Sequence, residues 1–524
     1  MRGKRRIAAL VWGLACAFHG VRGEEAPGGQ EAGQVWRLEP GQEGALQEAL
    51  TRCQAGDTVF LAAGTHVLRE TVRPSSRTSI RGEGMEKTRL VYEGTSPCVL
   101  IDLSQREEVE ISHLLLDARH DPKVQGGIIA HNARKLHLHH VGIRDLVPSP
   151  CFGPHGIHFH GTNPGREKGV TDSLIESCHL KNIGVGAKFG SGIRLAWGSS
   201  RNRVENCLIE ETGRGGIFAD NGSEDVVIRD NTVTGSGGEG LGIEVWGGCE
   251  RAVIEDNEID HWLSVGGCSW CAARRNVISS ATGTYKFCGI EGIGSHLVIT
   301  DNRVEGGQKI GLSVSGKQSK EFVYWARNTV RECNQWGAQF QGEAGGIAYH
   351  YLVDCRFESM PLDTGPVWYP GDEGYGFRIN GHCHHLTFEL CRFIDNGRAG
   401  VQIVGEDVGD LRLLHCLFDG NEGGSFRGLE DGMVIEHEPE LDVSFACPDQ
   451  VAAGREVQFL PTGSWIQQPR AGLLWDLGDG PSRGEGSPRH TYERPGAYKV
   501  ALIVWDREGT PSRAERRVVV TSGG

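Results

Sequence analysis

Six ionisable side chains recur at matching positions of a repeated strand in the middle of the chain. They are His158, His160, Arg194, Asp220, Glu244 and Glu291. Each directly follows an aliphatic or aromatic residue, and a β-strand turns alternate side chains to opposite faces. We therefore expect these side chains to share one outward face with the rings of Phe218 and Trp246. Carboxyl groups gathered beside aromatic rings are suited to general acid and base chemistry.

The spacing of the carboxyl groups follows from strand geometry. Asp220 and Glu244 lie one repeat apart and two residues apart along the strand, which places their Cα atoms about 8 Å apart. Glu244 and Glu291 lie two repeats apart in one column, about 9.6 Å. Inverting glycoside hydrolases hold their carboxyl groups roughly 6.5–9.5 Å apart, with a water between them. Both pairs suit this role, one group as base and the other as an acid whose pKa apolar neighbours such as Trp246 would raise.

The strands that position these groups belong to a regular repeat. Each repeat opens with glycine, an aliphatic residue, a variable residue and an apolar residue, as at 192–195, 216–219 and 242–245. An apolar strand follows and stops at an asparagine, and Asn231 and Asn257 are 26 residues apart. Short strands with this period and no helical stretch indicate a stacked β-solenoid.

One position of the repeat holds asparagine or cysteine in successive coils. The column is Cys178, Cys207, Asn231, Asn257, Asn276, Asn302, Asn328, Cys355, Cys391 and Cys416. Asparagine tolerates a left-handed backbone and can bond its neighbours, so it predicts an internal ladder. The cysteines in this column are expected to be stacked core thiols. Cys268 and Cys271 form a lone Cys-x-x-Cys, which predicts an isolated disulfide or two buried thiols rather than a zinc site.

The repeat resembles the right-handed parallel β-helix of the pectate-lyase-like superfamily, over residues 36–437. In that family the corresponding outward face is the floor of a saccharide-binding groove, so the resemblance implies a polysaccharide substrate. The same face carries Gln339, Arg378 and Asn380 in later repeats. The loops 145–156 and 359–375 are expected to form the groove walls, the second with Trp368 and Tyr369.

Two other functions fit the same face. A lyase acting on a uronic-acid polymer needs a base and a cation that neutralises the substrate carboxylate, for which Arg194, Arg378, His158 or His160 would serve. C5-epimerases of this fold share that chemistry. Many lyases of the fold use calcium held by clustered aspartates, and these strands carry no such cluster. We therefore predict no cofactor for a hydrolase and retain calcium for the lyase alternative.

A non-catalytic glycan-binding or adhesion protein is the third interpretation of the same face.

Two histidine-rich spots raise the question of a metal. His137, His139 and His140 lie in one strand pattern, and His382, His384 and His385 surround a cysteine in an expected turn. Neither has an acidic or cysteine partner at tetrahedral spacing, so we predict no metal site.

The N-terminal segment has the composition of an export signal. Basic residues at 2–6 precede a short apolar stretch at 7–18, which predicts a signal peptide over 1–23. A flexible lead-in over 24–35 and a short helix at 45–50 that caps the solenoid should follow. No later segment could span a membrane, so we expect a secreted, periplasmic or cell-surface protein.

The C-terminal segment 440–521 lacks the repeat pattern and carries different motifs. Residues 475–480, 490–492 and 495–500 resemble the PKD domain, an immunoglobulin-like module. Such modules act as spacers or weak polysaccharide binders; we favour a spacer with Trp475 buried, and Trp465 and Trp505 as candidates for exposure.

The predicted fold class is thus all-β, a right-handed parallel β-helix followed by a small immunoglobulin-like β-sandwich. The net charge of −14 argues against a nucleic-acid partner, and a monomer is expected.

Overall fold

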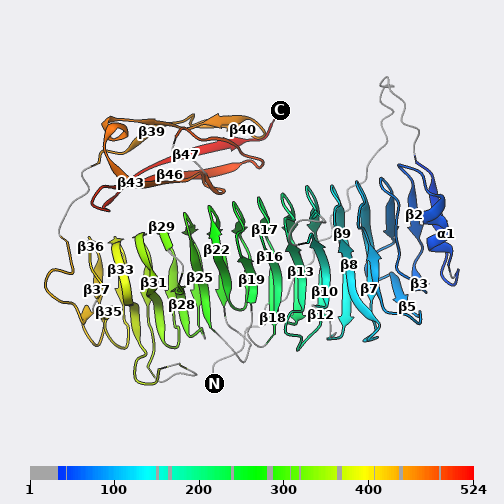
Figure 1. Cartoon of the computed structure of the whole chain (residues 1–524), viewed down its shortest axis with the longest axis horizontal. Helices are drawn as coiled ribbons and strands as arrows, with labels where there is room; N and C mark the ends of the chain where they lie inside the picture. The colour runs from blue at the N-terminus through cyan, green and yellow to red at the C-terminus, as the bar shows by residue number, and fades with distance from the viewer. Residues whose placement is uncertain are drawn as a thin grey trace, which may run out of the picture.

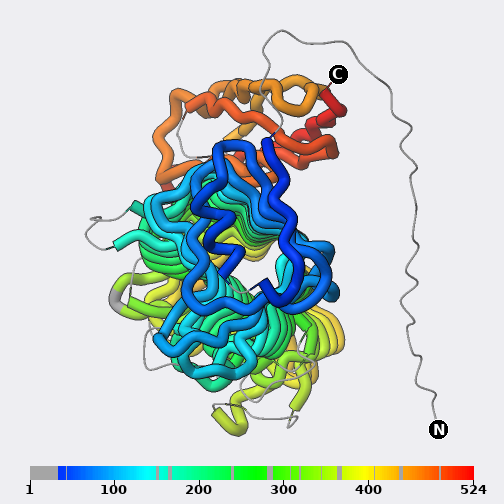
Figure 2. The backbone as a smooth tube through the Cα atoms, turned by 90° about the vertical axis from the view of Figure 1, so that its right-hand side faces the viewer, coloured from blue at the N-terminus to red at the C-terminus, as the bar shows by residue number. Residues whose placement is uncertain are grey.

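The computed structural model describes residues 33–42, 44–148, 153–162, 168–237, 241–279, 287–306, 308–317, 320–362, 367, 369–405, 407–435, 441–482 and 486–523. The predicted signal peptide, nearly all of the lead-in and Trp368 lie outside these ranges. Short parallel strands stack into one long solenoid (Figure 1), and its coils superimpose when viewed along the axis (Figure 2). The predicted all-β solenoid is therefore confirmed.

Three parallel sheets run along the solenoid. Sheet 1 contains β6 (Cys98–Asp102), β8 (Val124–Ala130), β10 (His155–His160), β13 (Ser191–Ala196), β16 (Gly215–Asp220), β19 (Leu241–Trp246), β22 (Leu263–Ser269), β25 (Cys288–Ser295), β28 (Ile310–Val314), the first parts of β31 (Trp336–Val353) and β33 (Tyr375–Glu389), β35 (Val401–Val404) and β38 (Phe426–Arg427). Sheet 2 contains β1 (Val35–Leu38), β2 (Thr58–Leu61), β4 (Ser79–Gly82), the first parts of β7 (Glu110–Asp117) and β9 (His137–Leu146), β11 (Leu174–Glu176), β14 (Arg203–Glu205), β17 (Val227–Arg229), β20 (Val253–Glu255), β23 (Ala272–Arg274), β26 (Val298–Thr300), β29 (Lys320–Ala326), the ends of β31 and β33, and β36 (Leu411–Leu414). Sheet 3 contains β3 (Gly64–Leu68), β5 (Thr88–Tyr92), the ends of β7 and β9, β12 (His179–Ile183), β15 (Leu208–Thr212), β18 (Thr232–Ser236), β21 (Glu258–Ile259), β24 (Val277–Ser279), β27 (Arg303–Glu305), β30 (Thr329–Arg331), β32 (Arg356–Glu358), β34 (Arg392–Ile394) and β37 (Leu417–Asp419).

An asparagine ladder links successive coils where sheet 2 turns into sheet 3. It consists of Asn231, Asn257, Asn276, Asn302 and Asn328, all buried. In the first four, Nδ2 donates to Oδ1 of the next asparagine at 2.9–3.0 Å, and the backbone N–H donates to the same oxygen at 3.0–3.1 Å. Each Nδ2 also donates to a backbone carbonyl of the preceding coil. The predicted ladder is confirmed.

Cysteines continue the ladder column at both ends. Cys178, Cys207, Cys355 and Cys391 are buried and Cys416 is half-buried. Every cysteine that the structure describes is a free thiol, including buried Cys268 and Cys271. The predicted stack of core thiols is confirmed, and for the Cys-x-x-Cys the structure selects two buried thiols.

The N-terminal end of the solenoid is capped. Helix α1 (Ala45–Arg52) buries Leu46, Ala49 and Leu50 on the first coil, as the short apolar pattern predicts. This helix covers core that the terminal coil would otherwise expose. Within the described ranges, no helix is long and apolar enough to cross a membrane.

The C-terminal domain is a small β-sandwich. Its elements are β39 (Ser444–Ala446), β40 (Gln450–Ala452), β41 (Glu456–Gln458), β42 (Leu460–Thr462), η1 (Ser464–Gln467), β43 (Arg470–Asp476), β44 (Pro481–Ser482), β45 (Arg489–Thr491), β46 (Gly496–Asp506) and β47 (Pro511–Thr521). Trp475 is fully buried in its core, as predicted. The suggestion that Trp465 and Trp505 are exposed is wrong, because only 2% of the surface of Trp465 and 0% of that of Trp505 is accessible to solvent.

The domain lies along sheet 2 (Figure 1) and packs against it through an apolar patch. On the domain the patch consists of Leu474, Ala501, Ile503 and Trp505, and on the solenoid it includes Ala272, Val298, Tyr324 and Tyr351. Trp505 is therefore buried by the solenoid, which the sequence of its own domain could not indicate. The domain is thus docked on the solenoid, and its role as a spacer stays a prediction.

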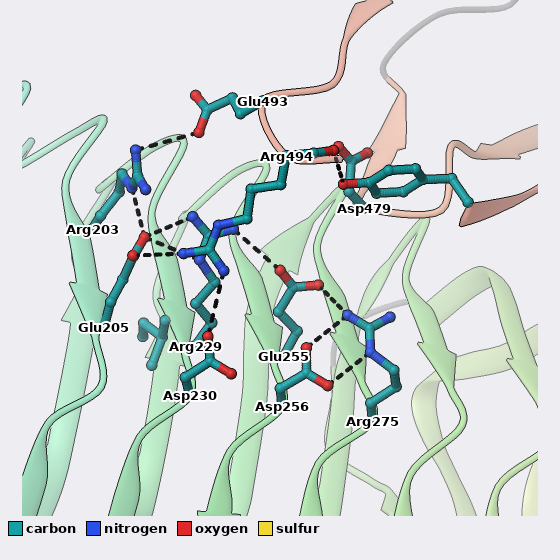
Figure 3. Close-up of polar contacts among 12 residues, drawn as sticks. Arg203, Glu205, Arg229, Asp230, Glu255, Asp256, Arg275, Asp479, Glu493 and Arg494 are labelled. Carbon is teal, nitrogen blue, oxygen red and sulfur yellow. Dashed lines mark hydrogen bonds and ion pairs between the residues drawn. The ribbon is translucent and has the colours of Figure 1, made fainter. Parts of the chain in front are cut away.

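Ion pairs extend the contact beside this patch (Figure 3). Glu205 of sheet 2 accepts hydrogen bonds from Arg203 at 2.6 Å, Arg229 at 2.8 Å and the domain's Arg494 at 2.9 Å. A second interdomain pair, Arg274 with Asp476 at 3.2 Å, is almost fully buried. A cavity of about 680 Å³ lies among these groups. Its arginines are already paired with carboxylates, so we assign it to the domain contact.

Replacing Asn276 by alanine should destabilise the solenoid by about 3 kcal/mol, because Asn257 would keep a buried N–H and a buried amide without their acceptor. Urea unfolding measures the change. The control is Glu258→Ala on a neighbouring exposed position, which should be nearly neutral. Equal stability of the two variants would contradict the ladder's role.

Replacing Ile503 by aspartate should release the C-terminal domain, because a carboxylate would be buried in the apolar patch. Small-angle scattering should then show a larger radius of gyration with unchanged β-sheet content. Val519→Asp, at a position that is 39% exposed, is the control. An unchanged radius for Ile503→Asp would argue against docking in solution.

Candidate functional site

The strand register of sheet 1 aligns the residues that the sequence places on one face. His158 pairs with Arg194, Arg194 with Phe218, and Phe218 with Glu244. Glu244 pairs with Ser264 on the next coil, and Ser264 pairs with Glu291 on the coil after that. In the neighbouring outward column, Asp220 pairs with Trp246. Asp220 thus lies one coil and two residues from Glu244, as the predicted spacing requires.

A cavity of about 460 Å³ opens over this part of sheet 1, and we call it the central pocket. It is lined by Phe189, Arg194, Arg214, Phe218, Asp220, Asn221, Glu244, Trp246, Trp262, Glu291 and Ile293. All three predicted catalytic carboxyl groups, with Arg194, Phe218 and Trp246, therefore meet in one place.

Asp220 is held by an arginine. Arg194 Nε donates to Asp220 Oδ2 at 3.0 Å, and Arg194 Nη2 lies 2.7 Å from the same oxygen. Asn221 Nδ2 donates to Oδ1 at 2.9 Å. Burial raises the pKa of Asp220, and Arg194 opposes that rise. This pairing favours the carboxylate form and fixes its orientation.

Glu291 is held by neutral donors instead. Ser264 Oγ donates to Glu291 Oε2 at 2.7 Å, and the indole N–H of Trp262 donates to the same oxygen at 3.3 Å. Burial raises the pKa of Glu291, and these two hydrogen bonds lower it in part. Glu291 is therefore a positioned carboxyl group without the arginine pair that Asp220 has.

Glu244 lies between these two carboxyl groups in the register. Its side chain is only 12% exposed, and its Oε1 lies 3.8 Å from Arg214 Nη2, beyond hydrogen-bond distance. Burial raises the pKa of Glu244 to about 7; Arg214 opposes the rise, and the negative charges of Asp220 and Glu291 add to it. Glu244 can thus exchange a proton near neutral pH, which a general acid requires.

Two aromatic side chains of the pocket differ in exposure. Trp246 is 44% exposed, and a Cβ added at Gly266 on the next coil would lie 2.2 Å from its ring. Glycine at that position therefore lets the indole lie over the sheet with one side open. Phe218 lines the pocket but is only 4% exposed, so it serves as apolar wall. Trp246 is the better platform for a ring-shaped ligand.

Other predicted site residues lie outside the central pocket. His158 and His160 stack one coil before Arg194 with ring centroids 4.5 Å apart, and burial lowers the pKa of His158 far below its ordinary value. Gln339, Arg378 and Asn380 follow Glu291 by two or more coils on the same face.

The predicted groove walls are only partly described by the structure. Tyr369 is 57% exposed and stacks on Trp336, and the Arg378 guanidinium lies 4.6 Å from the centroid of the Trp336 ring. The described residues of loops 145–156 and 359–375 do not line the central pocket. Their role as walls of a wider groove along sheet 1 stays a prediction.

Five lining residues were not predicted as site residues from the sequence: Phe189, Arg214, Asn221, Trp262 and Ile293. Arg214 and Trp262 stand immediately before β16 and β22, and Asn221 immediately follows β16. Positions that flank the strand ends lie at the rim of the same face. That placement is the signal that could have identified them.

Comparison with known proteins identifies the fold. Residues 154–260 and 261–434 match the family model described as right handed beta helix region. The chain belongs to this family. Residues 437–521 match the PKD domain model. Both sequence resemblances are therefore confirmed for this β-helix protein.

Solved structures with similar folds are distant in sequence. The mannuronan C-5 epimerase AlgE4 A-module of Azotobacter vinelandii is 12% identical, with a TM-score of 0.41 over 75% of this chain and 94% of that chain. The Agl-KA catalytic domain is 15% identical, with a TM-score of 0.45 over 74% and 66%. A mannuronic acid specific family 6 lyase from human gut microbiota is 14% identical, with a TM-score of 0.45 over 68% and 86%. Likenesses at this level carry no inference about the activity of this β-helix protein.

Curated relatives share only a short segment. Collagenase ColQ1 of Bacillus cereus (strain Q1) is 46% identical over 68 residues, which is 13% of this chain and 7% of that protein. Microbial collagenase of Vibrio alginolyticus is 40% identical over 52 residues, 10% of this chain and 6% of that protein. The chain thus spans less than a tenth of each collagenase.

The raised pKa of Glu244 predicts a pH-dependent stability difference. Its pKa is about 7 in the folded protein against an ordinary 4.5, so stability present below pH 4.5 is lost as the pH rises through 7. Glu244→Gln removes this loss. The variant should gain up to about 3 kcal/mol over the wild type at pH 8 relative to pH 4. Urea unfolding at both pH values measures it, and a pH-independent difference would contradict the shift.

Proposed function

We propose that this β-helix protein is a secreted polysaccharide-active enzyme that hydrolyses glycosidic bonds in the central pocket. The observation that carries the proposal is the Glu244 carboxyl group, which has a pKa of about 7 and lies between two other carboxyl-bearing positions. Groups with opposed environments in one pocket are the usual arrangement for an acid and a base.

The proposed acid is Glu244. In its neutral form it would donate a proton to the glycosidic oxygen as the bond to the leaving sugar breaks. Burial and the adjacent carboxylates supply that neutral form near pH 7. Arg214, 3.8 Å away, would stabilise the carboxylate that remains after the proton has left.

The proposed base is Asp220. Arg194 keeps it ionised and oriented, and its Cα lies about 8 Å from that of Glu244 by strand geometry. Carboxyl groups that rise from one face at this Cα separation could hold a water between them, which Asp220 would deprotonate as the water attacks the anomeric carbon from the opposite face, with inversion. Glu291, fixed by Ser264 and Trp262, would accept hydrogen bonds from sugar hydroxyls.

A sugar chain suits the surface around these groups. The partly exposed indole of Trp246 offers an apolar face on which a pyranose ring can stack. Sheet 1 continues beyond the pocket in both directions along the solenoid, which favours an extended polymer. On that continuation His158, His160, Gln339, Arg378, Asn380 and Tyr369 are proposed to bind further sugar units.

Elimination on a uronic-acid polymer, by a lyase or an epimerase, is the second candidate. It is favoured by the two arginines of the pocket, Arg194 and Arg214, which could neutralise a substrate carboxylate. Elimination is disfavoured by the ion pair between Arg194 and Asp220.

No cofactor enters the hydrolytic proposal, and calcium belongs to the lyase alternative alone. A monomer that acts outside the cell completes the proposal.

Activity of variants on a panel of polysaccharides tests the proposal. Glu244→Gln should lower the rate of reducing-end release about 100-fold or more on the polymer that the wild type cleaves, without loss of folding, because the acid is gone. Asp220→Asn should act similarly. Glu258→Gln, an exposed glutamate on sheet 3, is the matched control and should keep full activity.

Two results would contradict hydrolysis. Products with the ultraviolet absorbance of an unsaturated sugar, together with full activity of Glu244→Gln and none of Arg194→Ala, would favour elimination. Glycan binding without cleavage of any polymer would favour the binding-protein interpretation.

A further inference from the structure

Three histidines converge at the corner where sheet 2 turns into sheet 3, near the N-terminal end of the solenoid. His113 belongs to β7, and His139 and His140 belong to β9 on the next coil. Ser112 pairs with His139 and Leu114 with Val141, so His113 and His140 occupy equivalent corner positions. Both have left-handed backbones, with φ of 57° and 52°. In later coils this corner carries ordinary turn residues such as Asp230 and Asp256.

The ring nitrogens of the three side chains lie close together, with the His113 and His140 rings stacked at 4.7 Å between centroids. One ligand atom from each lies within 4.8 Å of the other two. His139 Nδ1 and His140 Nδ1 are 3.0 Å apart, close to the roughly 3.3 Å between two nitrogens that share a tetrahedral zinc ion. His113 Nδ1 is buried and has no hydrogen-bond partner among the described residues. Small side-chain rotations would bring all three nitrogens onto one ion.

A carboxylate fixes one of these rings. His139 Nε2 lies 3.2 Å from Glu110 Oε1, which also accepts a hydrogen bond from Ser112 Oγ at 3.1 Å. When the Nε2–H donates to Glu110, Nδ1 of His139 carries a lone pair on the side of His140 Nδ1. A carboxylate that holds the far nitrogen of a histidine is the usual outer partner of a metal ligand.

We propose that His113, His139 and His140 bind one divalent transition-metal ion, with zinc as the expected ion and water completing its coordination. Imidazole nitrogens suit zinc, copper and nickel, whereas calcium and magnesium require oxygen ligands. His140 is exposed, so the ion and its water can enter from solvent.

Neighbouring charges are compatible with this site. His137 is 4.4 Å from the His139 ring by centroids and is paired with Glu176 at 2.8 Å. Arg81 on the preceding coil repels a cation, and its side chain is exposed and can turn to solvent.

The ion would join two consecutive coils at a corner that the asparagine ladder does not reach. The ladder begins at Asn231, and the corresponding core positions here are Leu114 and Val141, which cannot bond each other. A metal clamp would supply that link from the outer side. The central pocket lies on sheet 1, so the clamp serves stability and leaves the proposed catalytic groups untouched.

Zinc binding to the full-length protein tests the proposal. After treatment with a chelator and its removal, titration calorimetry with zinc chloride should give one equivalent per chain, and zinc should raise the melting temperature. His113→Asn and His140→Asn should each weaken binding about 100-fold or more; asparagine is chosen because it tolerates the left-handed backbone. Glu110→Gln should weaken it about 10-fold, as loss of an outer partner does.

The matched control is His179→Asn, a partly exposed histidine paired with Glu210 at 2.7 Å, which should bind zinc like the wild type. Cobalt in place of zinc should give the intense visible bands of a tetrahedral site in the wild type and in this control. Circular dichroism checks that each variant is folded. Absence of stoichiometric zinc in the wild type, or wild-type affinity in both His113→Asn and His140→Asn, would overturn the proposal.

Discussion

The structure depends on the register between successive coils. Parallel strands about 4.8 Å apart place equivalent residues in columns, and a column is useful only when no coil slips. The asparagine ladder fixes this register from within, because each buried amide bonds the next coil and the preceding one. A slip of one residue would turn Glu244 into the core and an aliphatic neighbour to the surface. The positions of the proposed catalytic groups therefore follow from bonds on another side of the solenoid.

The same rigidity keeps three carboxyl groups buried close together in the central pocket. Three carboxyl groups share one pocket, and burial raises the pKa of each. They differ in what compensates the burial: an arginine for Asp220, neutral donors for Glu291, and an arginine beyond hydrogen-bond distance for Glu244. A flexible loop would relax such groups toward solvent. A stacked sheet holds the three groups in place, and each therefore keeps its different partners.

The fold and most of the outward columns could be predicted from the sequence because strand alternation and a period near 26 residues determine them. The asparagine and cysteine column, the capping helix and the alignment of Asp220 with Trp246 follow from that pattern. Strand alternation could not predict that Arg214 and Trp262 line the pocket, because they precede β16 and β22 and lie outside the alternating strands. Trp505 shows a second limit. The alternation of β46 gives two faces, and only the folded chain shows that one of them meets the solenoid.

The anomeric configuration of the first-formed product tests the central claim most directly. Proton nuclear magnetic resonance of fresh digests, recorded before mutarotation, distinguishes inversion from retention on whichever polysaccharide the protein cleaves. A pair of carboxyl groups one coil and two residues apart, with a water between them, predicts inversion. A product with retained configuration, or one with an unsaturated terminal sugar, would contradict the assignment of Glu244 as acid and Asp220 as base.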